Sequence, residues 1–97
     1  MHKYARQLLE RKAEERLRHL KQEVGDFKSR FVQTPGRPRY KYYETLRDLS
    51  AELAVVSKRL DELTKSDGTE WDSYYSMFDE AYDEVMERLA RTRFLIA

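Results

Sequence analysis

Apolar residues recur every three or four positions along most of the chain and form three separate rows. The first row consists of Leu9, Ala13, Leu17, Leu20, Val24, Phe27 and Phe31. This spacing puts all seven on one face of an α-helix and repeats the heptad of coiled coils. We therefore predict a helix over residues 2–32. Gly25 lies inside it and costs about 1 kcal/mol relative to Ala, so we expect a bend or close packing there.

The other two rows follow the same rule. The second consists of Tyr42, Leu46, Leu49, Leu53, Val56, Leu60 and Leu63. The third consists of Trp71, Tyr74, Phe78, Ala81, Val85, Leu89, Thr92 and Ile96, widened by Tyr75, Tyr82 and Met86. These two rows predict helices over 39–65 and 70–95. Connectors at 33–38 and 66–69 would then join the three helices. Pro35 and Pro38 lie in the first connector and prevent a helix from running through it. At the second, Gly68 suits a left-handed position, and Thr69 with Asp72 resembles a capping box.

Composition agrees with an all-α fold. Ala, Glu, Lys, Leu and Arg supply 48 of the 97 residues, while three Gly and two Pro leave few tight turns for a β-sandwich. We predict a single domain over 1–97, an antiparallel three-helix bundle with coiled-coil-like heptad packing. A hairpin whose third helix packs on a second copy remains the alternative, and we favour a monomer over a homodimer.

The chain has no cysteine, which excludes disulfides, thiolate metal sites and cysteine nucleophiles. No apolar stretch approaches the roughly 18 residues of a membrane span. The first residues lead directly into charged helical sequence without the apolar region of a secretory signal. We expect a cytoplasmic protein that does not associate with membranes.

A net charge of +1 conceals an uneven distribution. Residues 1–41 contain 12 basic and 5 acidic side chains, whereas residues 65–97 contain 4 basic and 8 acidic ones. The two regions either neutralise each other inside the bundle, or their charges face outward and attract a partner. The sequence leaves both possibilities open.

The third predicted helix carries a dense acidic cluster, composed of Asp79, Glu80, Asp83, Glu84 and Glu87. Its Glu80-x-x-Asp83 and Glu84-x-x-Glu87 pairs superficially resemble those of helical nucleotide pyrophosphohydrolases, so a metal-dependent hydrolase is a remote alternative. On the second predicted helix, Glu44, Asp48 and Glu52 share one face, opposite the apolar row. We interpret the cluster as a solvated acidic face. We expect no metal and no cofactor, and His19 between Glu15 and Glu23 is interpreted as a surface ion pair.

The first connector and the start of the second helix interleave basic and aromatic residues. The sequence Gly36-Arg37-Pro38-Arg39 resembles the core of an AT-hook, although Pro35 stands where that motif has a basic residue. Basic and aromatic side chains together also suit single-stranded nucleic acid. Nucleic-acid binding through the first helix and Arg37–Lys41 is therefore an alternative function that we do not favour.

The chain has neither a nucleophile-elbow serine nor a glycine-rich phosphate loop, so we expect no enzymatic activity. We expect a non-catalytic protein–protein interaction module: a small helical adaptor, a chaperone-like cofactor or an inhibitor of a larger assembly. Tyrosine and arginine are frequent at binding hot spots. The predicted partner-binding residues are Arg37, Arg39, Tyr40, Lys41, Tyr43 and Tyr75.

Overall fold

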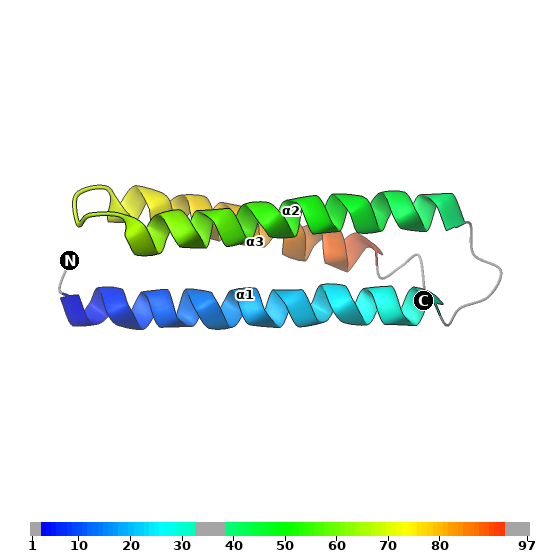
Figure 1. Ribbon diagram of the computed structural model, residues 1–97, viewed down its shortest axis with the longest axis horizontal. Coiled ribbons are helices and arrows are strands. Elements are labelled where there is room, and N and C mark those ends of the chain that lie inside the picture. The colour runs from blue at the N-terminus through cyan, green and yellow to red at the C-terminus, as the bar shows by residue number, and fades with distance from the viewer. Residues whose placement is uncertain (1–2, 33–38, 93–97) are drawn as a thin grey trace.

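The computed structural model describes residues 3–32 and 39–92, without the side chains of residues 31, 32 and 39. It contains three helices, α1 (Lys3–Val32), α2 (Arg39–Lys65) and α3 (Trp71–Thr92). Each helix runs antiparallel to the one before it, so that α1 and α3 point the same way (Figure 1). The bundle is a rod of 53 × 18 × 17 Å. The prediction of an all-α three-helix bundle is confirmed.

The three apolar rows meet along the axis of the rod and form its core. Buried positions include Leu20 on α1, Leu49 and Val56 on α2, and Phe78 and Val85 on α3, all fully enclosed. Other row members, such as Leu46, Leu53 and Tyr74, are partly buried and pack against this core. Phe31 and Ile96 also belong to the predicted rows, but their side chains lie outside the described residues. The heptad spacing thus identified the buried face of every helix.

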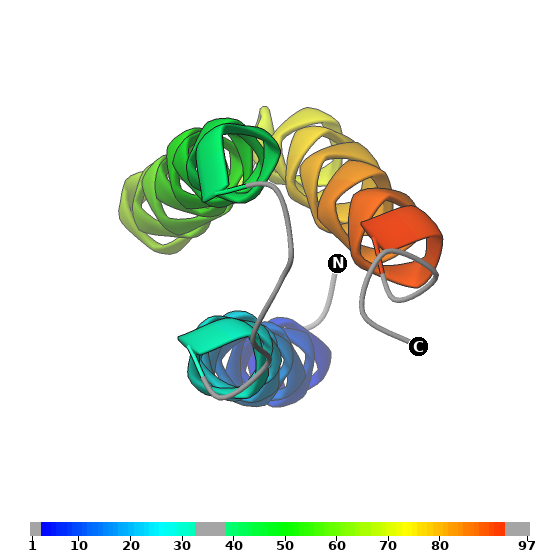
Figure 2. The ribbon, with the colours of Figure 1, turned by 90° about the vertical axis from the view of Figure 1, so that its right-hand side faces the viewer.

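The three helix pairs are not packed equally. Contacts are most extensive between α2 and α3, fewer between α1 and α2, and fewest between α1 and α3. Seen end-on, the helices stand at the corners of a triangle, with α1 set apart from the α2–α3 pair (Figure 2). The short turn at residues 66–70 holds α2 and α3 together, which explains why they form the tightest pair.

Two details of the α2–α3 turn differ from the predictions. Gly68 is not in the left-handed region, and an added Cβ would meet nothing within 4 Å. Thr69 and Asp72 form no capping box among the described hydrogen bonds; instead Asp67 Oδ1 accepts the Thr69 N–H at 2.9 Å. The end of α2 is capped locally by Ser66, whose N–H and hydroxyl donate to the Leu63 carbonyl oxygen. It is also capped from a different helix, because the Arg6 guanidinium of α1 donates to the carbonyl oxygens of Ser66 (2.7 Å) and Leu63 (3.5 Å). Such a tertiary cap leaves no local signature in the sequence.

The close packing considered for Gly25 is absent. A Cβ built at this position would have no heavy atom within 4 Å, and the residue is exposed on α1. The fold therefore does not require glycine here. Within the described ranges, no helix is both long and apolar enough to cross a membrane.

Candidate functional site

The start of α2 exposes two tyrosines on either side of a buried one. Tyr40 is 69% exposed and Tyr43 is 62% exposed, whereas Tyr42 between them is only 5% exposed. Lys41 is also exposed. Since a helix turns by about 100° per residue, Tyr42 faces the core while its neighbours face solvent. Tyr40, Lys41 and Tyr43 are called the tyrosine patch below.

Tyr42 fixes the patch to the rest of the bundle. Its ring stacks on Phe27 of α1 with 5.8 Å between ring centroids, and its hydroxyl donates to the Lys28 carbonyl oxygen at 3.1 Å. The Tyr43 ring meets it edge-on at 5.4 Å. Burial, and then the nearby Tyr43, raise the pKa of Tyr42 above its ordinary value, so the phenol stays neutral. The patch consequently lies on a helix turn with a fixed position.

The predicted partner-binding residues do not all meet at this surface. Tyr75 lies near the opposite end of the bundle, where it is partly buried and stacks on Trp71 with centroids 5.2 Å apart. It is therefore part of the packing around Trp71, away from the patch. Arg37 and the side chain of Arg39 lie outside the described residues.

The acidic cluster of α3 is divided between two roles. Asp79 accepts a hydrogen bond from Arg16 of α1 at 2.7 Å. The Arg16 guanidinium also lies over the rings of Tyr82 (4.2 Å) and Phe78 (5.4 Å). Burial opposes the charge of Arg16, but Asp79 outweighs that effect and raises the pKa of Arg16. The remaining four carboxylates are exposed, and they are called the acidic stripe: Glu80, Asp83, Glu84 and Glu87.

Two of the three α2 carboxylates considered for a hydrolase, Asp48 and Glu52, form ion pairs with Arg88 of α3. Arg88 Nε donates to Glu52 Oε1 at 2.6 Å, and its Nη1 lies 3.8 Å from Asp48 Oδ2. These three side chains connect α2 to α3. On α1, His19 lies 3.7 Å from a Glu23 oxygen. In the part of the chain that the structure describes, no three metal-ligating side chains are grouped so that they could hold a metal ion.

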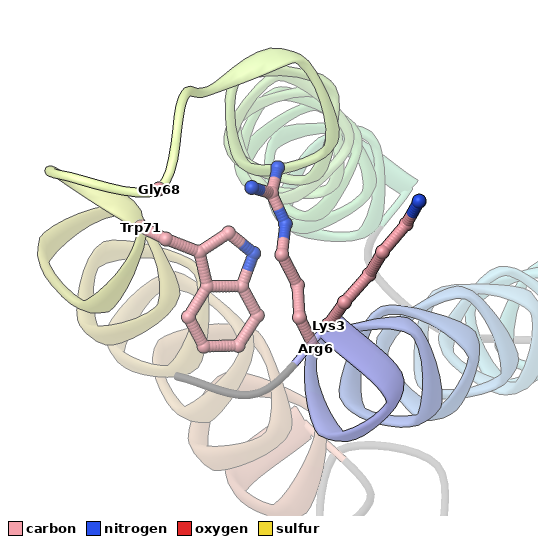
Figure 3. A pocket seen from close by; sticks show the side chains of 4 residues that line it. All are labelled: Lys3, Arg6, Gly68 and Trp71. Carbon is pink, nitrogen blue, oxygen red and sulfur yellow. The ribbon is translucent and has the colours of Figure 1, made fainter.

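At the turn end of the bundle, four residues line a cavity of about 290 Å³: Lys3, Arg6, Gly68 and Trp71. The Arg6 side chain extends from α1 towards the α2–α3 turn with the Trp71 indole beside it, whereas the Lys3 side chain extends away from Gly68 (Figure 3). Outside this lining, Glu10 Oε1 accepts hydrogen bonds from Trp71 Nε1 (3.0 Å) and Arg6 Nε (2.9 Å). The Trp71 indole N–H and the Arg6 guanidinium beside the cavity are therefore engaged in hydrogen bonds.

Arg6 and Glu10 were not among the site residues predicted from the sequence. Arg6 and Glu10 continue the apolar row of Ala13 and Leu17 at spacings of four and three, so they occupy seam positions. Extending the heptad upstream through charged residues would have identified them.

No family model matches the chain, and no curated protein or solved structure matches it either.

Proposed function

We propose that the chain is a cytoplasmic, non-catalytic protein-binding module that engages its partner through the tyrosine patch. It would act as a small helical adaptor, a chaperone-like cofactor or an inhibitor of a larger assembly. The observation that carries the proposal is the exposure of Tyr40 (69%) and Tyr43 (62%) on a helix turn anchored by Tyr42. The cysteine-free, charge-rich composition supports the cytoplasmic assignment.

The chemistry of the patch suits a protein partner. Tyrosine offers a large apolar ring and a polar hydroxyl, and it is enriched at the centres of protein interfaces. Each ring has few rotatable bonds, so burying it costs little conformational entropy. Because Tyr42 already holds this turn against α1, binding would not have to order the backbone as well.

Internal ion pairs support a non-catalytic role. Arg88 engages Asp48 and Glu52, and Arg16 engages Asp79. A carboxylate that already neutralises an arginine is a poor metal ligand or general base, because removing it would leave a partly buried cation unpaired. The hydrolase alternative would need these groups to be available.

The test compares proteins captured by the immobilised full chain and by two variants. Tyr40→Ala/Tyr43→Ala should lose the specific partner, because it removes both exposed rings. The matched control is Tyr4→Ala, since Tyr4 is 70% exposed but lies on the first turn of α1 at the other end of the rod. An identical set of captured proteins for all three baits would refute the proposal. Arg37→Glu/Arg39→Glu then tests whether the preceding basic residues contribute.

A further inference from the structure

One side of α1 carries three exposed cations in the second half of the helix. Arg18, Lys21 and Lys28 are exposed, together with Gln22, Gly25 and Ser29. These six residues follow a spacing of three and four and so share one side of the helix. Among the residues that the structure describes, none of the three cations forms an ion pair. Arg18, Lys21 and Lys28 are called the basic stripe.

The acidic stripe of α3 is opposite to it in sign, and part of it has the same spacing along the helix. Glu80 and Glu87 are seven residues apart, as are Lys21 and Lys28, which corresponds to about 10 Å along either helix axis. Glu80 with Glu84, and Asp83 with Glu87, place like charges one turn apart, which opposes the helix. An opposite charge arriving from outside would relieve that repulsion.

The two stripes do not neutralise each other inside one molecule. The one ion pair joining α1 and α3 in the described ranges is that of Arg16 and Asp79, and neither residue belongs to a stripe. All residues of both stripes are exposed, on the sides of their helices away from the core. The two helices that carry them stand at different corners of the bundle (Figure 2). Of the two arrangements that the sequence left open, the stripes therefore adopt the outward-facing one, whereas Arg16 and Asp79 neutralise each other inside the bundle.

We propose that a second copy of this chain occupies the basic stripe, with its own acidic stripe packed against Arg18, Lys21 and Lys28. Gly25 supports this assignment, because it lies between Lys21 and Lys28 and its missing side chain fills no space in the fold. A flat position between two cations lets an acidic helix approach closely. Each copy presents one stripe of each sign on different helices, so the contact joins unlike surfaces and extends from copy to copy. It uses α1 and α3, requires no residue of the tyrosine patch and does not depend on the proposed function.

Sedimentation velocity over a range of protein concentrations tests the proposal, at low salt and again at high salt. The wild-type chain should associate at low salt, and the association should weaken about tenfold or more at high salt, because exposed charges are screened. Lys21→Glu/Lys28→Glu and Asp83→Lys/Glu87→Lys should each remain monomeric. Their equimolar mixture should associate again, since each variant then meets a stripe of opposite sign.

Lys12→Glu/Lys58→Glu is the matched control, because it makes the same change in net charge at two exposed lysines outside the stripe. It should associate like the wild type, while Gly25→Gln should associate more weakly with unchanged helicity by circular dichroism. A wild-type chain that stays monomeric at low salt overturns the proposal, as does equal loss of association in the control. Binding of duplex DNA or an acidic protein through Lys21 and Lys28 by a monomeric chain also overturns it and assigns the stripe to that ligand.

Discussion

The two ends of the rod use aromatic and charged side chains in opposite ways. At the turn end, Trp71 is buried and hydrogen-bonded to Glu10, and Arg6 caps α2. At the connector end, Tyr40 and Tyr43 face solvent. Three helices meet at the turn end, but α3 has 22 residues against 30 in α1 and 27 in α2, so its described part stops short of the connector (Figure 1). Among the described residues, aromatic rings at that end therefore have fewer neighbours to cover them.

Removing the tryptophan should have the largest effect on this contrast. Trp71→Ala should lower the free energy of unfolding by about 3–5 kcal/mol, because it empties a core site of a large ring and also removes a hydrogen bond to Glu10. Urea denaturation followed by circular dichroism measures the loss. If that variant does not fold, Trp71→Phe should still be measurably less stable than wild type. A loss below about 1 kcal/mol for Trp71→Ala would mean that the turn end is not closed as described.

Glu10→Ala should have a smaller but clear effect. It removes the acceptor shared by Trp71 Nε1 and Arg6 Nε, so we expect a loss of about 1–3 kcal/mol. Glu14→Ala is the matched control, since Glu14 is an exposed carboxylate on the next turn of the same helix. That control should stay within about 0.5 kcal/mol of wild type. Equal effects in the two variants would contradict a specific role for Glu10.

Alkaline pH should weaken the connector end through Tyr42. Its pKa is raised in the folded chain, by burial first and then by Tyr43, so the unfolded chain releases the phenol proton at a lower pH than the folded chain does. The free energy of unfolding should therefore fall as the pH rises from about 10, the ordinary pKa of tyrosine, through the raised pKa of the folded chain. Denaturation at pH 8 to 11 should show a shallower decline for Tyr42→Phe than for wild type. Parallel declines would exclude Tyr42 as a source of the pH dependence.

The patch substitutions should have the smallest effect on stability. Tyr40→Ala/Tyr43→Ala should change the free energy of unfolding by no more than about 0.5 kcal/mol per residue, because both rings are mostly exposed. The melting temperature by circular dichroism provides the check. A loss comparable to that of Trp71→Ala would show that these rings serve the fold, and it would remove the contrast between the two ends.

The sequence predicted the architecture and the buried face of each helix because heptad spacing is a local pattern. It failed where a side chain acts on a distant segment. Arg6 caps a helix that ends about sixty residues later, so nothing near Arg6 in the sequence announces that role. Gly68 was expected to end α2 through a left-handed backbone conformation, which it does not adopt. Hydrogen bonds from Arg6 and Ser66 to the last carbonyl oxygens end the helix instead.

The candidate surfaces were predictable to a similar extent. The exposure of Tyr40 and Tyr43 follows from the position of Tyr42 in the apolar row, because its neighbours on the helix then lie outside that row. Tyr75 was named as a candidate because tyrosine is frequent at binding hot spots, but its ring stacks on Trp71. Whether α1 and α3 neutralise each other depends on which sides of the two helices face each other. The total charge of each region does not contain that information.

The cap that Arg6 places on α2 also bears on the order of folding. The α2–α3 hairpin needs only a short loop to close, whereas Arg6 and Ser66 are separated by 60 positions and must find each other late. Helix α1 makes the fewest contacts with the other two helices, so it should be the first to detach when the native state opens locally. Amide hydrogens of α1 should exchange with solvent ahead of those in the middle of α2, so the bundle behaves as a stable hairpin with a third helix that docks onto it last.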